Sequence, residues 1–521
     1  MAADAELVFG FVYAVGTNAD PVASLLKNYL KQYNYGSREF RVSEHLRTLD
    51  LDITFDPTSA FDEMNALMNA GNQARAAART NDILAAMAVN DIADRRSYDQ
   101  EGKPEALKRV AHLVRSLKTS EEVRLLREIY RPGFFLIGIA SDEDQQRNYL
   151  TREKGLSEDE ASLVMERDQD EKLPYGQRTR DTFYLADVFV ELTGERYKEQ
   201  LERFLELVFS HPFKTPTREE HAMFMAYASA ARSAQFGRQV GASVTSPEGD
   251  VVAVGFNEVP SPAGGPYWET YSWEHDTGDQ RDHVFGDKID SNYLHRCRIV
   301  DSIVSSVQSR PSQEAGRVVN ELIKEDDLRS AVMDSELKDI TEYGRAVHAE
   351  MDALLTCARL GIPVRGKKLF VTTFPCHNCT RHIIAAGISS VTYIEPYPKS
   401  RAAELHKDAI CFSADEARTG KIPFLPFVGI GPRRYLDLFS FELSTGGRIE
   451  RKDNEGKAKV PARAARGPRV AMLPLSYLER EAKLLHDNEA VINELEGIAD
   501  EQTSGKSTSE NEYGVEPPAN G

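Results

Sequence analysis

The chain has 521 residues, of which 41% are hydrophobic and 28% are charged, and this length predicts two or three domains. The formal net charge of −18 argues against a broad nucleic-acid surface, which leaves only a local basic groove as an alternative. No apolar run approaches the roughly 20 residues that span a bilayer, and the first residues lack the basic flank of a signal peptide. We therefore expect a cytoplasmic protein with no membrane partner. Five cysteines, an odd and low number, do not suggest a disulfide framework.

The N-terminal segment reads as strand, glycine turn and helix. Residues 7–15 are apolar, Gly16, Thr17 and Asn18 follow, and a helix is predicted to start with Asp20 as N-cap and Pro21 as its first residue. This is the frame of a phosphate-binding loop, but five residues separate Gly10 from Gly16 and Thr17 stands where the motif has lysine. Two interpretations stay open: an ordinary turn, or a regulatory nucleotide site at Gly16, Thr17 and Asn18 that binds through backbone N–H groups.

The rest of the first 210 residues keeps an α/β alternation. Its patterns predict a helix at 109–130, a buried parallel strand at 134–139 and helical structure within 181–209. Residues 141–180 are polar and charged, which is typical of a solvated face and also compatible with an arginine lid over phosphates. We place a domain boundary near His211 and Pro212.

A second predicted domain covers residues 211–440. Thr217 and Glu220 have capping-box spacing and start a helix predicted to reach Phe236. The apolar runs 239–245 and 250–256 flank a turn and predict a β-hairpin.

Residues 258–345 are predicted to form a long insertion, partly helical around 300–307 and 315–323. The insertion contains residue types that could bind a second metal: His275, His283, His295 and Cys297. They lack a tight ligand pattern, so isolated polar or packed residues are the favoured interpretation.

After the insertion comes His348-Ala349-Glu350, followed by Pro375-Cys376-His377-Asn378-Cys379. This pair of motifs resembles the signature of zinc-dependent nucleobase deaminases. His348, Cys376 and Cys379 would be three Zn²⁺ ligands, leaving the fourth tetrahedral position to water. Glu350 would stay off the metal and carry protons. The alternative is a structural zinc site or two buried thiols.

The surrounding pattern predicts how these residues are held. A helix is expected at 351–360, directly after His348 and Glu350, and another at 378–386, which ends at Gly387. Strands are predicted at 368–374 and 390–395, which makes them a parallel pair. The two helix N-termini would then converge on one metal, where their dipoles favour thiolates.

Residues 441–521 are predicted to be a C-terminal extension. It would contain a docking helix at about 474–490 and a disordered tail at about 501–521, because the tail has no apolar periodicity.

The chain as a whole resembles the bacterial anti-phage dCTP/dCMP deaminases. The resemblance covers about residues 6–440 and rests on Ser116-Leu117-Lys118 with Glu121-Glu122-Val123, on Tyr175-Gly176-Gln177 through Asp187, and on the two zinc motifs. It implies an N-terminal P-loop NTPase-like, kinase-like parallel-sheet domain in residues 1–210 and a C-terminal cytidine deaminase-like α/β/α domain.

By the same resemblance we expect Zn²⁺ as cofactor and deamination of dCTP and/or dCMP to deoxyuridine nucleotides and ammonia, in phage defence. A homo-oligomer and a regulatory nucleotide or phage-signal partner are also implied. The competing hypotheses are a polynucleotide cytidine deaminase and a nucleotide-sensing binding module.

The resemblance also nominates substrate contacts. Asn257 would hold the sugar hydroxyl, with a turn-forming asparagine as its alternative. The other predicted contacts with base or phosphate are Ala349, Thr373, Phe374, Tyr397, Lys399, Ser400, Arg232, Arg238 and Gln239. One departure is Asp352, because related enzymes often have asparagine there, and this questions the hydrogen bonding of the nearby loop.

Overall fold

The computed structural model describes residues 4–53, 55, 58–262, 264–269, 279–309, 325–335, 337, 340, 342–397, 399–413, 416–443, 447–470 and 474–497. The chain forms two compact units. Unit 1 comprises Met1–Leu136, Ser141–Leu185 and Ala471–Gly521, and unit 2 comprises Ile137–Ala140 and Ala186–Val470. Among the described residues, no helix is both long and apolar enough to cross a membrane.

Unit 1 is built on parallel strands. Its strands are β1 (Leu7–Tyr13), β2 (Gly36–Arg41) and β3 (Val110–Arg115), and β3 pairs in parallel with both of the others. Strand β4 (Phe134–Ala140) gives its first three residues to unit 1 and its last four to unit 2. The order of this first sheet is β12-β5-β4-β1-β3-β2. Strand β1 is buried along nearly its whole length, as its continuous apolar run requires.

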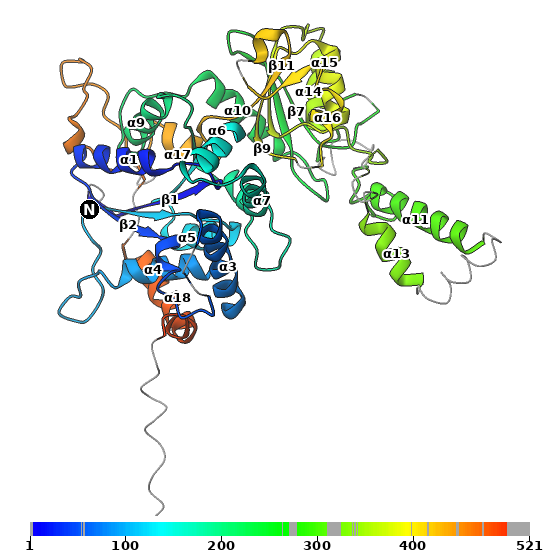
Figure 1. Ribbon diagram of the computed structural model, residues 1–521. Helices are drawn as coiled ribbons and strands as arrows, with labels where there is room; N and C mark the ends of the chain where they lie inside the picture. Colours follow the sequence, from blue (N-terminus) through cyan, green and yellow to red (C-terminus); the bar gives the residue numbers. More distant parts are fainter. Residues whose placement is uncertain are drawn as a thin grey trace, which may run out of the picture. The chain divides into compact units, whose positions relative to one another are not determined.

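Helices surround these strands in unit 1. They are α1 (Asp20–Gln32), α2 (Val42–His45), α3 (Ala60–Ala78), α4 (Ile83–Ala93), α5 (Ser120–Tyr130), α6 (Glu143–Asn148), the π-helix Tyr149–Glu153, α7 (Glu158–Gln169), α8 (Thr179–Phe183) and α18 (Pro474–Leu495). Helices α3, α4, α5 and α18 pack together (Figure 1). Within this group, the buried Arg96 guanidinium pairs with Glu481 of α18 at 2.7 Å and with Glu6 at 2.9 Å.

Two expectations for unit 1 are wrong in detail. Residues 109–130 were expected to be one helix, but the first part is strand β3, and α5 begins only at Ser120, where Thr119 and Glu122 form a capping box. The interior position of β3, between β1 and β2, overrides its helix-compatible composition. Helix α1 is capped at Ala19, with Asp20 as its first residue, and the Asp20 N–H donates to the Asn18 side chain at 3.2 Å.

Unit 2 contains a second sheet, of order β10-β11-β9-β8-β6-β7. Its strands are β6 (Gly241–Thr245), β7 (Val251–Phe256), β8 (Lys368–Thr373), β9 (Ser390–Glu395), β10 (Ile410–Cys411) and β11 (Ile422–Pro426). Strand β6 pairs antiparallel with β7 and β8, whereas β8, β9, β11 and β10 run parallel. The predicted hairpin and the predicted parallel pair are both confirmed. Unit 2 also holds β5 (Val188–Glu191), parallel to β4, and β12 (Gly429–Ile430), antiparallel to β5.

Helices cover both faces of the second sheet. Those of unit 2 are α9 (Arg196–Val208), α10 (Arg218–Ala230), α11 (Ser291–Ser309), α13 (Glu325–Asp334), α14 (Ala349–Arg359), α15 (His377–Ala386), α16 (Ala402–Leu405) and α17 (Tyr435–Phe439). Gly241 lies against α10, since a Cβ there would be 1.9 Å from the Ala226 carbonyl oxygen, and Gly255 lies against α14, 2.3 Å from that of Ala349. Gly255 pairs with Ala242, the neighbour of Gly241, so the two glycines face opposite sides of the sheet.

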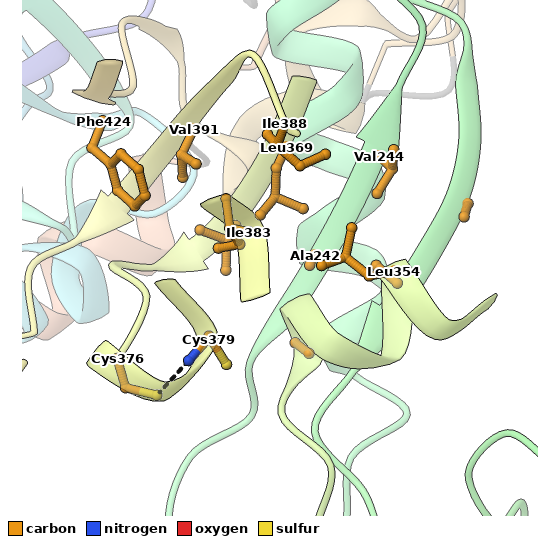
Figure 2. Close-up of a cluster of buried hydrophobic side chains, with 14 of the residues drawn as sticks. Ala242, Val244, Leu354, Leu369, Cys376, Cys379, Ile383, Ile388, Val391 and Phe424 are labelled. Carbon is orange, nitrogen blue, oxygen red and sulfur yellow. Dashed lines mark hydrogen bonds between the residues drawn. The ribbon is translucent and has the colours of Figure 1, made fainter. Parts of the chain in front are cut away.

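The core beside α14 and α15 contains Ala242, Val244, Leu369 and Val391 from the strands and Ile383 from α15. Figure 2 shows Cys376 and Cys379 near Ile383, at the edge of this cluster. The apolar strands and the inner faces of both helices therefore fix where the N-terminus of α15 lies.

Other predictions for unit 2 have mixed outcomes. The capping box at Thr217 is confirmed, but α10 ends at Ala230 instead of reaching Phe236. Residues 181–209 contain strand β5 before helix α9, because the apolar run there joins the first sheet. Within the insertion, α11 includes the predicted helix at 300–307 and packs beside α13 (Figure 1). The predicted helix at 315–323 and the tail at 501–521 lie outside the described residues.

Candidate active site

Two helix starts bring the three predicted metal ligands together. His348 is the N-cap residue of α14 and Cys376 is the N-cap residue of α15, while Cys379 lies in the first turn of α15. The His348 Nδ1 atom is 3.3 Å from the Cys376 Sγ and 3.4 Å from the Cys379 Sγ. All three ligand atoms lie within 4.8 Å of one another. Cys376 and Cys379 lie 28 and 31 positions after His348 in the sequence. They form one cluster with it because strand β8 returns the chain to the edge of the sheet at which α14 begins.

The charges within this cluster depend on one another. A hydrogen bond from the Cys379 thiol, together with the His348 ring, lowers the pKa of Cys376 to about 4. The hydrogen bond to Cys376 raises the pKa of His348 to about 9 despite its burial. The Cys376 thiolate and burial raise the pKa of Cys379 well above its usual range. The cluster therefore already holds one thiolate beside a cationic imidazole.

These residues fit Zn²⁺. The donor set of one imidazole nitrogen and two sulfurs is typical of zinc, whose bonds of about 2.3 Å to sulfur and about 2.0 Å to nitrogen require ligand atoms roughly 3.5 to 4 Å apart. The observed distances from Nδ1 of 3.3 and 3.4 Å are close to that spacing. The cofactor of this region is Zn²⁺.

A second metal group is not found in the described part of the insertion. His283 lies 3.6 Å from Asp279, and His295 stacks on Tyr343 with ring centroids 4.9 Å apart. Cys297 is a free, half-buried thiol, and His275 lies outside the described residues. All five cysteines of the chain are free thiols in the structure.

Glu350 lies in the first turn of α14 and is 4% exposed. Burial, followed by the charge of Cys376, raises the pKa of Glu350 to about 7. Its carboxyl is not part of the His/Cys/Cys ligand group. It can therefore hold or release a proton near neutral pH, which a general acid and base must do.

A cavity of about 230 Å³ opens onto the cluster. Its wall includes the predicted residues His348, Ala349, Glu350, Cys376, Asn257, Arg238, Thr373, Phe374 and Tyr397. It also includes residues that sequence reasoning missed: Gln235, Gly237, Val240, Asp282, Asp290, Ser291, Asn292, Gly344 and Ala346. Several of these belong to the insertion, which carries no motif that could have identified them.

Asn257 lines the cavity, but its side chain is bonded to backbone. Its Oδ1 accepts from the Val240 N–H at 2.7 Å, and its Nδ2 donates to the Arg238 carbonyl at 2.7 Å. The adjacent Glu258, which is fully buried, accepts from the Ala234 N–H at 2.8 Å and from the Gln235 side chain at 2.9 Å. These two residues hold the loop after α10 against the cavity, a role the sequence did not reveal for Glu258.

The loop also carries Arg238, which is half exposed and pairs with Glu395 at 2.5 Å. Glu395 in turn accepts from the Thr373 hydroxyl at 3.3 Å. Phe374 packs edge-on against Tyr393, with centroids 4.9 Å apart, and Arg238 lies over Tyr397 at 5.8 Å. One side of the cavity is therefore aromatic, with a cation at its edge.

Four predicted contacts do not line the cavity: Arg232, Gln239, Lys399 and Ser400. Arg232 lies between the rings of Trp268, at 3.2 Å, and Phe256, at 3.9 Å, and burial lowers its pKa to about 10. Gln239 donates to the Ser233 carbonyl at 2.7 Å, and Ser400 donates to the Pro375 carbonyl at 2.8 Å. Lys399 is exposed.

Asp352, where related enzymes often have asparagine, supports the loop that follows β7. Its carboxylate is 4% exposed and accepts from the Phe256 N–H, at the end of β7, at 3.2 Å. Burial raises the pKa of Asp352. The residue thus ties α14 to the strand that leads to Asn257, and an aspartate can make this hydrogen bond as an asparagine would.

The three N-terminal residues of the predicted nucleotide loop, Gly16, Thr17 and Asn18, lie in unit 1. They line a separate cavity of about 320 Å³.

Comparison with known families identifies the region around the cluster. Residues 216–395 match the family described as the cytidine and deoxycytidylate deaminase zinc-binding region. A segment of 53 residues is 47% identical to ComE operon protein 2 of Bacillus subtilis (strain 168), covering 10% of this chain and 28% of that protein. Another of 55 residues is 38% identical to the deoxycytidylate deaminase of Enterobacteria phage T4, covering 11% and 28%.

The similar segments span less than a third of the length of these two relatives. Among solved structures, the dCMP deaminase of cyanophage S-TIM5 in its apo form is 16% identical with a TM-score of 0.21, over 41% of this chain and 100% of that one. A TM-score of 0.21 is too low to support a conclusion about this chain.

Proposed function

Because residues 216–395 carry a cytidine and deoxycytidylate deaminase zinc-binding region, we propose that this protein converts a deoxycytidine nucleotide into a deoxyuridine nucleotide and ammonia. The observation that carries the proposal is Glu350, a buried carboxyl on the wall of the cavity beside the three ligand residues. A carboxyl next to a His/Cys/Cys set, but outside it, is what nucleobase deamination requires for proton transfer.

In this mechanism His348, Cys376 and Cys379 would hold zinc, which when bound would supply an activated water as the attacking group. Glu350 accepts a proton from that water and delivers it to the ring nitrogen of cytosine. It would then take the second proton of that water, from the hydroxyl group newly bonded to C4, and deliver it to the amino group, so that the C4–N bond breaks and ammonia leaves. Burial of Glu350 supports this cycle, since it brings the pKa of the carboxyl close to the pH at which both proton acceptance and donation are efficient.

The choice of a small nucleotide is supported by the size and wall of the cavity. A volume of about 230 Å³ suits a pyrimidine ring with its sugar, and Phe374 and Tyr397 offer flat surfaces to a base. We propose that Arg238 meets the substrate phosphate by exchanging Glu395 for it, and that Lys399 and Ser400 assist from outside the cavity. Arg232 and Gln239 do not line the cavity, so we propose that they act on the substrate indirectly, by supporting the loop that carries Arg238. Both dCMP and dCTP are proposed substrates.

By its resemblance to the anti-phage deaminases, we further propose that the protein acts in the cytoplasm as a homo-oligomer and depletes the deoxycytidine nucleotide pool during phage infection. The N-terminal unit would regulate this activity.

The test is to incubate the purified protein with dCMP, dCTP, CMP, CTP and single-stranded DNA and to separate the uracil products by chromatography. We expect deoxyuridine nucleotides from dCMP or dCTP, and none from the Glu350→Gln variant. Product from single-stranded DNA alone would replace this proposal with polynucleotide deamination. Equal product from wild type and variant would remove Glu350 from the mechanism.

A further inference from the structure

Unit 1 contains a cavity of about 320 Å³ that the deamination chemistry does not use. This volume is at the lower end of the range for small-molecule sites, which hold mostly apolar walls and a few polar groups. The apolar wall here comes from α2, α3 and α4, through Val42, Leu46, Met64, Met68 and Leu84. The opposite wall is the turn at Gly16 between β1 and α1.

Two groups that could bind a phosphate at this turn are already paired with a carboxylate of the chain. The Val15 N–H donates to Asp168 Oδ2 at 2.8 Å, and the Lys118 ammonium pairs with Asp168 Oδ1 at 2.8 Å. Asp168 is almost fully buried, so a carboxylate of the chain itself fills the position of an anion. At Gly16, a Cβ would lie 2.8 Å from the Gln146 carbonyl oxygen, which places a second acceptor against the turn.

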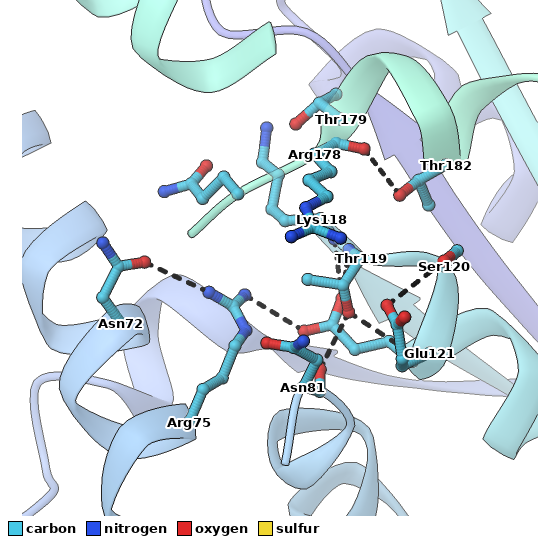
Figure 3. A network of polar contacts seen from close by, with 12 residues as sticks. Asn72, Arg75, Asn81, Lys118, Thr119, Ser120, Glu121, Arg178, Thr179 and Thr182 are labelled. Carbon is cyan, nitrogen blue, oxygen red and sulfur yellow. Dashed lines mark hydrogen bonds and ion pairs between the residues drawn. The ribbon is translucent and has the colours of Figure 1, made fainter. Parts of the chain in front are cut away.

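Two further cations of the cavity wall are paired as well, whereas Lys154, also in the wall, is exposed and lies over the Tyr149 ring at 5.4 Å. Arg115 pairs with Asp20 at 2.7 Å and with Glu39 at 2.9 Å. The buried Arg75 pairs with Glu122 at 3.2 Å. Figure 3 shows Arg75 between Asn72 and the segment that carries Thr119 and Glu121. A phosphate at the turn would lie beside the carboxylates of Asp168 and Asp20 and would have to compete with them for Lys118 and Arg115, so the turn favours an uncharged ligand.

Three polar atoms of residues in the cavity wall have no hydrogen-bond partner among the described residues: Arg75 Nε, Arg115 Nε and Gln177 Oε1. All three side chains are more than nine-tenths buried, with Arg75 2% exposed and Arg115 and Gln177 each 6% exposed. A buried donor or acceptor without a hydrogen bond destabilises the protein, so a ligand that bonded to these atoms would bind more tightly. Donor and acceptor together match the amide-like edge of a nucleobase.

The backbone of Gln177 is held independently of its side chain. Its N–H donates to the Glu171 carboxylate at 3.3 Å, and its carbonyl accepts from the Glu171 N–H at 2.9 Å. Gly176 allows this close turn, because a Cβ there would be 2.6 Å from the Glu171 carbonyl oxygen. The segment Tyr175-Gly176-Gln177, conspicuous in the sequence, thus presents one amide side chain to the cavity.

We propose that this cavity is a second binding site, for an uncharged nucleoside, whose base lies against the methionine and leucine side chains and whose edge bonds to Gln177 and Arg75. The site belongs to unit 1 and does not depend on the deaminase assignment.

The experiment measures binding of thymidine, deoxycytidine, deoxyadenosine and deoxyguanosine, and of their 5′-monophosphates, to the full chain by isothermal titration calorimetry. We expect at least one nucleoside to bind with Kd below about 1 mM, and its monophosphate to bind this site no more tightly. Gln177→Leu should weaken that binding at least tenfold, whereas Gln73→Leu, an exposed glutamine on α3 outside the cavity, should change it less than twofold.

Leu67→Trp, which fills the cavity from α3, is a second variant for the case that Gln177→Leu does not fold. Zinc content is measured alongside, as a check that the deaminase site is intact in both variants. Nucleoside binding that both variants retain is assigned to the deaminase cavity. Any of three results would overturn the proposal. The first is that no nucleoside binds, and the second is that neither variant weakens the binding. The third is that a monophosphate binds more than tenfold tighter than its nucleoside and that Gln177→Leu abolishes this binding.

Discussion

In unit 2 buried ionisable groups gather in one cluster, whereas around the cavity of unit 1 buried charges are paired with opposite charges. His348, Cys376 and Glu350 lie in one cavity wall with Cys379 beside them, and each shifts the pKa of another. Around the cavity of unit 1, by contrast, Lys118 meets Asp168 and Arg75 meets Glu122. The first arrangement is completed by a cation from outside, and the second needs none. Burial of charge therefore indicates a metal or catalytic site only where the charges are not already paired.

The largest expected effect is the loss of zinc from unit 2. Cys379→Ala removes one of three ligands, so we expect elemental analysis to find no stoichiometric zinc and assays to find no deamination. Cys357→Ala is the matched control, because Cys357 is equally buried on α14 but outside the ligand group. Full zinc in the Cys379 variant would place the metal elsewhere.

Glu350→Gln should separate metal binding from chemistry. The amide keeps the size of the side chain but cannot carry protons, so we expect full zinc content with turnover lower by about 10²–10⁴-fold. Steady-state rates with dCMP and dCTP, beside elemental analysis, measure both. A turnover within a few-fold of wild type would contradict the role of Glu350.

Lys118→Met tests whether the charges of unit 1 are structural. It leaves Asp168 buried without its cation, and we expect the free energy of unfolding to fall by about 3–5 kcal/mol, measured by denaturant titration. Lys118→Met with Asp168→Leu should recover part of this loss, while zinc content stays unchanged in both variants. No recovery in the double variant would argue against a paired charge as the cause.

Zinc affinity should rise with pH. A ligand imidazole must be neutral, and the pKa of His348 is raised to about 9, so below that pH zinc has to displace a proton from it. Between pH 6 and 8 the apparent affinity should increase by about tenfold per pH unit for each proton displaced. Competition with a chelator at several pH values measures this, and an affinity independent of pH would be inconsistent with a protonated His348.

The smallest effect is expected from Gly16→Val. Gly16 has φ of +83°, a left-handed conformation that costs a residue with a side chain roughly 1–2 kcal/mol, and its Cβ would meet Gln146. We expect lower thermal stability and altered deaminase control with unchanged zinc content.

Wild type should show no rapid ATP hydrolysis, because the loop lacks the lysine. Robust ATPase activity abolished by this substitution would make unit 1 a catalyst instead of a regulator.

Two of the errors in the element predictions have one cause. Residues 110–115 and 188–191 are strands whose composition suits a helix as well, and they become strands because neighbours in the first sheet supply hydrogen bonds and burial. In contrast, the start of α10 was predicted correctly from Thr217 with Glu220, because a capping box is complete within four residues.

The sequence by itself predicted the clustered His348, Cys376 and Cys379, the neighbouring Glu350 and the parallel strands that hold them, because these depend on residue types at short, fixed spacing. Only the tertiary structure decided that Asn257 is bonded to backbone, that Arg232 lies between two rings and that the insertion contributes Asp282 and Asn292 to the cavity. It also decided that Asp168 occupies the turn at Gly16 from 153 positions along the chain. Such partners are chosen by packing between distant segments, and no local pattern in the sequence specifies them.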